Sequence, residues 1–284
     1  MLGGGWTEVV ALAAAFAIAV LATPAGISGA VLLLPFQVSV LGTPSPAVTP
    51  TNLLYNVIAT PGALYRYWRQ GQTGGRLALV LTAGTLPGVI AGAIIRVELL
   101  PSAHVFDFVV AAVLLPLGMW LALTSPTRVE GEVAEGEARA VRAGRAVRAG
   151  REARAVRAVA PPVLILLAVV VGCVGGIYGI GGGSILAPVL IGTGRPPREV
   201  APAALASTFV TSIAGVVTFA VLSVHHHGPV APDWPTGIAL GVGGLAGAYT
   251  GARIQRHLPD TVIRRVMGVL VVAIGARYLW SGLN

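Results

Sequence analysis

Two glycine-rich segments, far apart in the chain, carry the groups best suited to hold a small solute. The first is Gly26-Ile27-Ser28-Gly29, and the second is Gly179-Ile180-Gly181-Gly182-Gly183-Ser184. Glycine allows positive φ and leaves its backbone N–H open to a ligand. A helix that starts beyond such a turn directs unpaired donors and a positive dipole end at an anion. The segments therefore predict an oxyanion-binding centre; close packing of membrane helices is the alternative, because small residues let helices touch.

A stripe of polar residues follows each glycine-rich segment. Asn52, Asn56 and Thr60 recur every four residues and share one helical face, as do Thr208 and Ser212 in the second half. Both stripes begin after a Val-x-Pro step, and alignment of these steps places Asn56 opposite Thr208 and Thr60 opposite Ser212. A polar stripe on a membrane helix faces protein or water rather than lipid. We expect the stripes to line a solute path, with hydrogen bonding between helices as the alternative.

The predicted binding site is uncharged. Its residues are Gly26, Ser28, Gly29, Asn52, Asn56, Gly179, Gly181, Gly182, Gly183, Ser184, Thr208 and Ser212. No catalytic residue, metal ligand or cofactor is expected. The consecutive histidines at 225–227 would diverge on a helix, and we place them in an external loop. The Gly-x-Ser-Gly pattern at 26–29 also occurs in intramembrane serine proteases. Such a serine needs a histidine base within hydrogen-bond reach, and the histidines of this chain lie at segment ends or in loops.

Composition places the chain in a lipid bilayer. Hydrophobic residues make up 55% of its 284 residues and charged residues 11%, whereas soluble domains hold about 25% charged residues. Apolar runs lie at 6–22, 26–42, 50–68, 76–95 and 104–124, and again at 160–174, 176–192, 200–222, 236–254 and 265–282. Backbone exposed to lipid must satisfy its own hydrogen bonds, so these runs are expected to be helical. Arg96 and the other charged residues in or beside the runs are placed near run ends.

The two matching sets of runs predict an all-α multi-pass membrane protein with an internal duplication. We expect repeats at 1–124 and 160–284, each a glycine-broken helical hairpin followed by three transmembrane helices. Residues 125–159 are rich in arginine and predict a cytoplasmic linker, or a helix lying on anionic headgroups. The arginine-bearing loops at 66–76, 193–199 and 253–265 share the linker's side only if each repeat crosses the membrane an odd number of times. The repeats are therefore predicted to be inverted.

These motifs resemble those of the TauE/SafE sulfite-exporter family. The resemblance rests on the run Gly-Ile-Tyr-Gly-Ile-Gly-Gly-Gly-Ser-Ile-Leu-Ala-Pro at 176–188, on Ala-Ser-Thr at 206–208, and on the duplicated layout. It covers the chain outside the arginine-rich linker. In the first half, Gly29-Ala30-Val31 stands where the family has a glycine triplet. The resemblance implies passage of small sulfur-containing anions, such as sulfite, thiosulfate or sulfonates, across the bacterial inner membrane.

The expected function is secondary transport, with export of such anions by alternating access as one repeat rocks against the other. No enzymatic activity is expected. The expected partners are the anionic substrate and the lipid bilayer, with a proton or a sodium ion as the candidate coupling ion; the net charge of +8 does not indicate nucleic acid. An anion channel and a non-transporting membrane scaffold are the alternatives.

Overall fold

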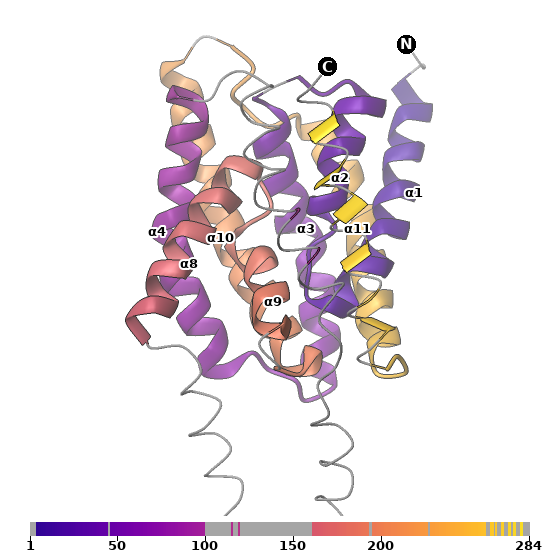
Figure 1. Ribbon diagram of the computed structural model, residues 1–284. Helices are drawn as coiled ribbons and strands as arrows, with labels where there is room; N and C mark the ends of the chain where they lie inside the picture. Colours follow the sequence, from indigo (N-terminus) through magenta and orange to yellow (C-terminus); the bar gives the residue numbers. More distant parts are fainter. Residues whose placement is uncertain are drawn as a thin grey trace, which may run out of the picture.

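The computed structural model describes residues 4–44, 46–99, 161–192, 195–226 and 228–259, together with isolated positions at 115, 119 and between 262 and 280. All regular secondary structure in this part of the chain is helical. In chain order the elements in Figure 1 are α1 (Gly4–Ala22), η1 (Thr23–Ala25), α2 (Ala30–Phe36), η2 (Gln37–Leu41), α3 (Val48–Arg69), α4 (Gly75–Glu98), α8 (Pro161–Tyr178), α9 (Gly182–Gly192), α10 (Pro197–His225) and α11 (Trp234–Gln255). Most of the predicted run at 104–124, the linker at 125–159 and part of the run at 265–282 lie outside the described residues.

Helices occupy every predicted apolar run that falls within the described residues, which confirms the all-α prediction there. The breaks in both hairpins occur at glycines. Gly26 follows η1 with φ 73°, and Gly179 follows α8 with φ 78°. Residues with a side chain are strained at such φ values, so these glycines determine where each hairpin turns.

The second arm of each hairpin is short. The α-helix α2 has 7 residues and continues into the π-helix η2 of 5 residues, while α9 has 11 residues. Crossing the hydrocarbon core of a bilayer takes about 20 helical residues. Neither arm is long enough to cross a bilayer as a helix, which is a point that the sequence left open.

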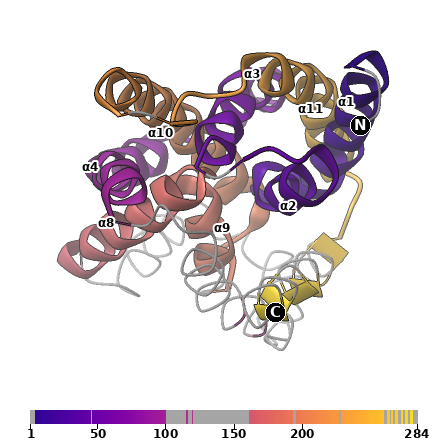
Figure 2. The ribbon, with the colours of Figure 1, turned by 90° about the horizontal axis from the view of Figure 1, so that it is seen from above.

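The helices form two rows, seen end-on in Figure 2. One row contains α4, α10, α3 and α11, and the other contains α8, α9, α2 and α1. Each member of the second row packs against its counterpart in the first: α8 against α4, α9 against α10, α2 against α3, and α1 against α11. The short arms α2 and α9 therefore lie beside the helices that carry the polar stripes.

Glycines bring helices from the two halves of the chain into close parallel contact. A Cβ added at Gly243 of α11 would lie 2.1 Å from the carbonyl oxygen of Leu12, and one added at Gly247 would lie 2.3 Å from that of Phe16. Helices α1 and α11 thus run in the same direction, and α8 meets α4 in the same manner. Small residues commonly allow such backbone contact between membrane helices. The first helix of each half is consequently packed on a long helix of the other half.

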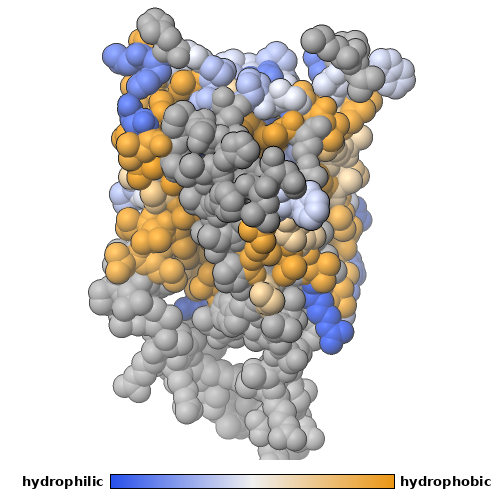
Figure 3. Space-filling model, turned by 45° about the horizontal axis from the view of Figure 1, so that its top comes forward, coloured by the Kyte–Doolittle hydropathy of each residue, from blue (hydrophilic) through white to orange (hydrophobic). Residues whose placement is uncertain are grey.

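The surface of the described helices is suited to lipid. Within the described part of the chain, three helical segments are long and apolar enough to cross a membrane: Trp6–Ala25, Gly75–Glu98 and Pro197–His225. Many large apolar side chains on the helices are exposed, among them Leu79 and Val217. Figure 3 shows apolar residues over the middle of the molecule, with hydrophilic residues gathered toward its two ends.

The loops sort onto two edges. At one edge, Nη2 of Arg198 donates to the carbonyl of Arg256 over 3.4 Å, and Nε2 of Gln70 donates to the carbonyl of Ala252 over 3.3 Å. These contacts join the three loops that were predicted to share the arginine-rich side. At the other edge, the start of α11 meets the start of α3. The grouping of the described loops agrees with the charge pattern of the sequence.

Candidate functional site

The two glycine-rich segments contact each other. The N–H of Ser28 donates a hydrogen bond to Oγ of Ser184 over 3.1 Å, and the hydroxyl of Tyr178 donates to the carbonyl of Val31 over 3.0 Å. Both serines are buried, with 3% and 1% of their surface exposed. Ser28 precedes α2, and Ser184 lies in the first turn of α9. The starts of the two short arms are therefore joined.

Each serine also contacts the polar helix of its own half. Oγ of Ser28 accepts from the N–H of Ala30 over 3.1 Å and donates to Oδ1 of Asn56. Oγ of Ser184 lies 3.1 Å from Oγ1 of Thr208. Asn56 and Thr208 are the residues that the alignment of the two halves placed opposite each other, so the two contacts occupy equivalent positions.

Both polar stripes face the protein interior. Asn52, Asn56 and Thr60 of α3 and Thr208 and Ser212 of α10 are all at most 3% exposed. The stripes therefore face away from lipid, as expected from their polarity. The hydroxyl of Thr60 donates to the carbonyl of Asn56 over 2.6 Å, within its own helix. A hydroxyl hydrogen used in this way is not available to a ligand.

Two donor groups on fully buried side chains have no protein partner in the described part of the chain. They are Nδ2 of Asn56 and Oγ of Ser212, which belong to fully buried side chains. Because Oδ1 of Asn56 already accepts from Ser28, the amide N–H groups point away from that serine. Oγ of Ser212 lies beside Gly181, where an added Cβ would approach it to 3.1 Å. Buried polar groups without a partner are rare, and these two are the donors best placed to meet an anion.

The glycines at the hairpin turns pack against the beginnings of the polar helices. A Cβ added at Gly26 would lie 2.7 Å from Cα of Ala201 in α10, and one added at Gly179 would lie 2.4 Å from the carbonyl oxygen of Thr49 in α3. Each turn therefore contacts the polar helix of the other half, and the two contacts are again equivalent.

Other predicted glycines serve close packing. A Cβ added at Gly183 would lie 1.9 Å from the carbonyl oxygen of Ala204, and one added at Gly29 would lie 2.4 Å from the hydroxyl of Tyr55. The N–H of Gly182 is directed at a threonine hydroxyl of α10 over 3.4 Å. The packing alternative considered from the sequence accounts for the absence of side chains at Gly29 and Gly183.

Gln37 and Thr85 belong to this region but were not predicted. Nε2 of Gln37 donates to Oδ1 of Asn52 over 3.0 Å, and Nδ2 of Asn52 donates to the carbonyl of Ala30 over 2.9 Å. Oγ1 of Thr85, on α4, lies 3.1 Å from Oγ of Ser207. The available signal for Gln37 was an amide within an apolar run. We call the following set the central polar cluster: Ser28, Gln37, Asn52, Asn56, Ser184, Thr208 and Ser212.

Buried donors also hold the hairpin turns. Nε2 of Gln255, at the end of α11, donates to the carbonyl of Pro24 over 2.6 Å. At the other turn, Oγ1 of Thr49 donates to the carbonyl of Ile177 over 3.2 Å, and Nε of Arg96 lies 3.4 Å from the same Oγ1. Arg96 is fully buried. Arg96 is one of two arginines, with Arg277, that the predicted topology places on the side away from the linker, and its burial shows that it is held inside the protein and is not a loop charge.

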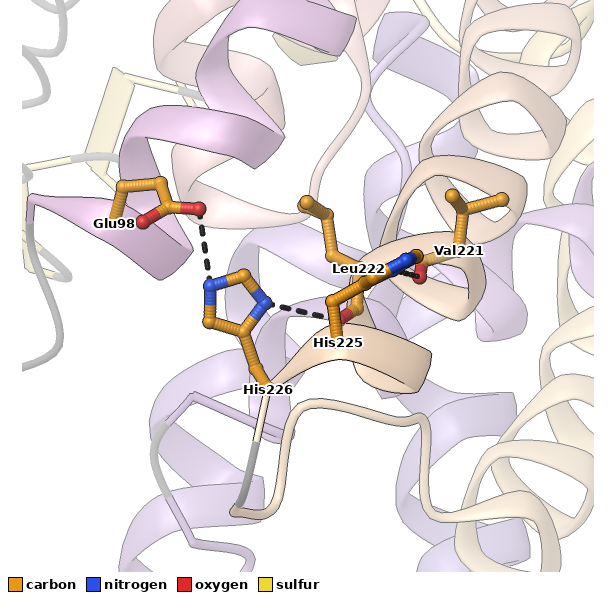
Figure 4. A network of polar contacts seen from close by, with 5 residues as sticks. All are labelled: Glu98, Val221, Leu222, His225 and His226. Atoms are coloured by element: carbon orange, nitrogen blue, oxygen red, sulfur yellow. Dashed lines mark hydrogen bonds and ion pairs between the residues drawn. The ribbon is translucent and has the colours of Figure 1, made fainter.

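A surface contact joins the ends of α4 and α10. Nε2 of His226 lies 3.0 Å from Oε1 of Glu98, as Figure 4 shows. Nδ1 of His226 lies 3.0 Å from the carbonyl oxygen of Leu222, whereas Nδ1 of His225 lies 3.3 Å from that of Val221. The two histidines thus have different partners, and within the described residues no group of three metal-binding side chains occurs. The histidine run begins at the end of α10, not wholly in the loop predicted for it.

Comparisons with known proteins cover nearly the whole chain. A family model described as sulfite exporter TauE/SafE matches residues 11–278. The chain is 24% identical over 242 residues to the probable membrane transporter protein YunE of Bacillus subtilis (strain 168), a match that spans 85% of this chain and 83% of the relative. It is 25% identical over 265 residues to a probable membrane transporter protein of Xylella fastidiosa (strain Temecula1), spanning 90% and 88%. No solved structure matches the chain significantly. The extent of the family match confirms the resemblance seen in the motifs, and the chain belongs to the TauE/SafE sulfite-exporter family.

Proposed function

We propose that this protein is a secondary transporter that exports small sulfur-containing anions across a bacterial inner membrane by alternating access. Family membership and relatives described as probable membrane transporters support transport as the general function. Within the molecule, the proposal rests on the contact between Ser28 and Ser184, where both broken hairpins meet inside an uncharged polar cluster. Discontinuous helices that meet in this way commonly form the substrate sites of transporters.

Reciprocal contacts support an inverted relation between the two halves. Helix α1 packs on α11 as α8 packs on α4. Ser28 meets Asn56 as Ser184 meets Thr208, and each hairpin turn lies against the opposite polar helix. A two-fold axis in the membrane plane, the relation between inverted repeats, produces pairs of contacts of this kind.

The chemistry of the central polar cluster suits a small anion. By residue type, all of its members are uncharged. Asn56 and Ser212 offer buried donors without a protein partner in the described structure, and α9 begins beside them with the positive end of its dipole. Hydroxyl, amide and backbone donors stabilise an oxyanion in a site that excludes water. Because no member of the cluster carries a fixed positive charge, the anion is also expected to be released readily.

The closure of both ends supports alternating access over an open channel. The turn at Gly26 is held by Gln255, and the turn at Gly179 is held by Thr49, so both glycines are buried. The central polar cluster between the turns is at most 3% exposed. These features support an occluded state of an alternating-access cycle. We assign the arginine-rich edge to the cytoplasm, because short arginine-bearing loops stay on that side.

Transport in proteoliposomes tests the proposal. Purified protein is reconstituted, and movement of labelled sulfite and thiosulfate is followed with and without an imposed proton or sodium gradient. We expect movement against a concentration gradient when the coupling ion gradient is present, which a channel does not produce. Asn56→Leu should lower the rate about tenfold or more, because a buried hydrogen-bonding group that contacts the anion is lost.

A matched control is Thr250→Val. Thr250 is only partly buried, and its hydroxyl donates to the carbonyl of Ala246 in its own helix. This variant should retain the wild-type rate. Wild-type rates in Asn56→Leu would reject the site, and failure of the wild-type protein to move any of these anions would reject the function.

A further inference from the structure

The orientation of the Gln37 amide is determined by its neighbours. Nδ2 of Asn52 donates to the carbonyl of Ala30 over 2.9 Å, and a backbone carbonyl can only accept. Oδ1 of Asn52 is therefore the atom that faces Gln37, and Gln37 must present its amide nitrogen, which it does over 3.0 Å. Oε1 of Gln37 is left without a hydrogen-bond partner in the described part of the chain, on a side chain with 0% of its surface exposed.

The amide of Asn56, one helical turn from Asn52, leaves a donor without a partner where Gln37 leaves an acceptor. Ser28 Oγ accepts from the N–H of Ala30 and gives its own hydrogen to Oδ1 of Asn56. The unpartnered atom of Asn56 is consequently the donor Nδ2. Residues four apart on a helix are neighbours on one face, so Asn52, which holds Gln37, lies next to Asn56. The central polar cluster thus contains an oriented acceptor near an oriented donor.

These two orientations restrict what the cluster can bind. A fully deprotonated oxyanion offers only acceptor atoms, so it would satisfy Asn56 and Ser212 but would place an oxygen against Oε1 of Gln37. A buried acceptor that lacks a donor loses the hydrogen bond it had with water. A solute that carries one O–H or N–H group in addition to its anionic oxygens satisfies both kinds of group. By residue type the cluster contains no charged side chain, which also favours a single negative charge over two.

We propose that Gln37 is a specificity-determining residue and that the transported species is a monoanion bearing a hydrogen-bond donor. The donor is either the proton of a singly protonated oxyanion or a hydroxyl or ammonium group on an organic anion. Oε1 of Gln37 accepts that hydrogen while Asn56 and Ser212 donate to the anionic oxygens. This inference rests on the proposed transport function and adds the class of solute to it.

The experiment compares two probes that differ by one donor. Ethanesulfonate and 2-hydroxyethanesulfonate are supplied separately to proteoliposomes that contain the wild-type protein, Gln37→Met or Thr250→Val. Methionine keeps the approximate length of glutamine and removes the acceptor. We expect the wild-type protein and Thr250→Val to prefer 2-hydroxyethanesulfonate about tenfold, the discrimination that an unpaired buried polar group produces. In Gln37→Met the ratio of the two rates should fall toward one.

A second measurement uses the wild-type protein alone and so does not depend on the folding of a variant. The initial rate for inorganic sulfite is recorded at a constant total concentration over the pH range in which hydrogen sulfite loses its proton. The rate should follow the hydrogen sulfite fraction, whereas the rate for 2-hydroxyethanesulfonate, which keeps its donor over this range, provides the reference for other pH effects.

The outcomes separate the two proposals. Equal wild-type rates for the two sulfonates, or a preference that survives in Gln37→Met, overturns the role of Gln37 and leaves transport standing. A sulfite rate that follows the deprotonated form overturns the donor requirement. If the wild-type protein moves none of these solutes, the proposed function itself fails, and the inference fails with it.

Discussion

The two polar helices hold equivalent positions but carry different chemistry. Helix α3 presents Asn52 and Asn56 toward the short arms, whereas α10 has Ala204 and Thr208 at the aligned positions. An amide has distinct donor and acceptor ends. In α3 the carbonyl of Ala30 fixes the orientation of the Asn52 amide, and Oδ1 of Asn56 accepts from Ser28. A hydroxyl rotates and either donates or accepts. Under the proposed function, we expect the first half to determine how a solute is oriented and the second half to adapt to it.

The largest expected effect concerns how tightly each short arm packs on its polar helix. Gly183→Ala should lower the stability of the protein by about 3 kcal/mol, the upper part of the usual range for overpacking, because the new methyl group meets a backbone carbonyl. Gly29→Ala should cost less, since its methyl group meets the end of the Tyr55 side chain, which can move. Thermal unfolding of both variants in detergent measures the difference. Equal loss of stability would contradict the proposed asymmetry in packing.

Exchanging the chemistry of the two helices tests the comparison directly. Asn56→Thr should reduce the transport rate about tenfold, because the oriented amide donor is lost. Thr208→Asn should reduce it only roughly threefold, since a polar group that can bond to Ser184 is retained at the position. Initial rates in proteoliposomes provide the measurement. A larger loss in Thr208→Asn than in Asn56→Thr would reverse the roles assigned to the halves.

The two hairpin turns are held by different groups. The Gln255 amide holds the first turn, whereas the Thr49 hydroxyl, which Arg96 contacts, holds the second. Gln255→Leu leaves the Pro24 carbonyl without this donor and should destabilise the closed turn by about 1–3 kcal/mol. Labelling of a cysteine introduced at Ala25, in a background in which Cys173 is replaced by serine, should then be faster from the cytoplasmic edge. The corresponding change at the other turn is Thr49→Val. In this variant, labelling of the same introduced cysteine should become faster only from the opposite edge. Unchanged labelling in both variants would show that these donors do not hold the turns closed.

The smallest effect is expected at the surface contact between Glu98 and His226. Both side chains are partly exposed, and exposed ion pairs contribute about 0–1 kcal/mol. Glu98→Gln should therefore leave the unfolding temperature and the transport rate close to the wild-type values. A loss comparable to that of Gln255→Leu would show that the junction of α4 and α10 is an energetic counterpart of the turns.

Local patterns in the sequence predicted most of the helices and the positions of both breaks, because hydrophobic runs and glycines act over a few residues. The alignment of the Val-x-Pro steps also predicted that Asn56 and Thr208 would correspond. The burial of Arg96 and the role of Gln37 could not be predicted in this way. Both depend on which helices become neighbours, and a single polar residue in or at the end of an apolar run looks the same whether it faces lipid, solvent or a partner.

The first helix of each half packs on a helix of the other half, and this packing affects which parts can move as rigid bodies. Helix α1 is joined to α11, and α8 to α4, by backbone contacts that leave no room for a side chain. A displacement that kept each half of the polypeptide together would have to open both of these seams. A displacement between the set α1, α3 and α11 and the set α4, α8 and α10 would preserve them. The mechanical units of this fold are therefore expected to be composites, each assembled from helices of both halves of the chain.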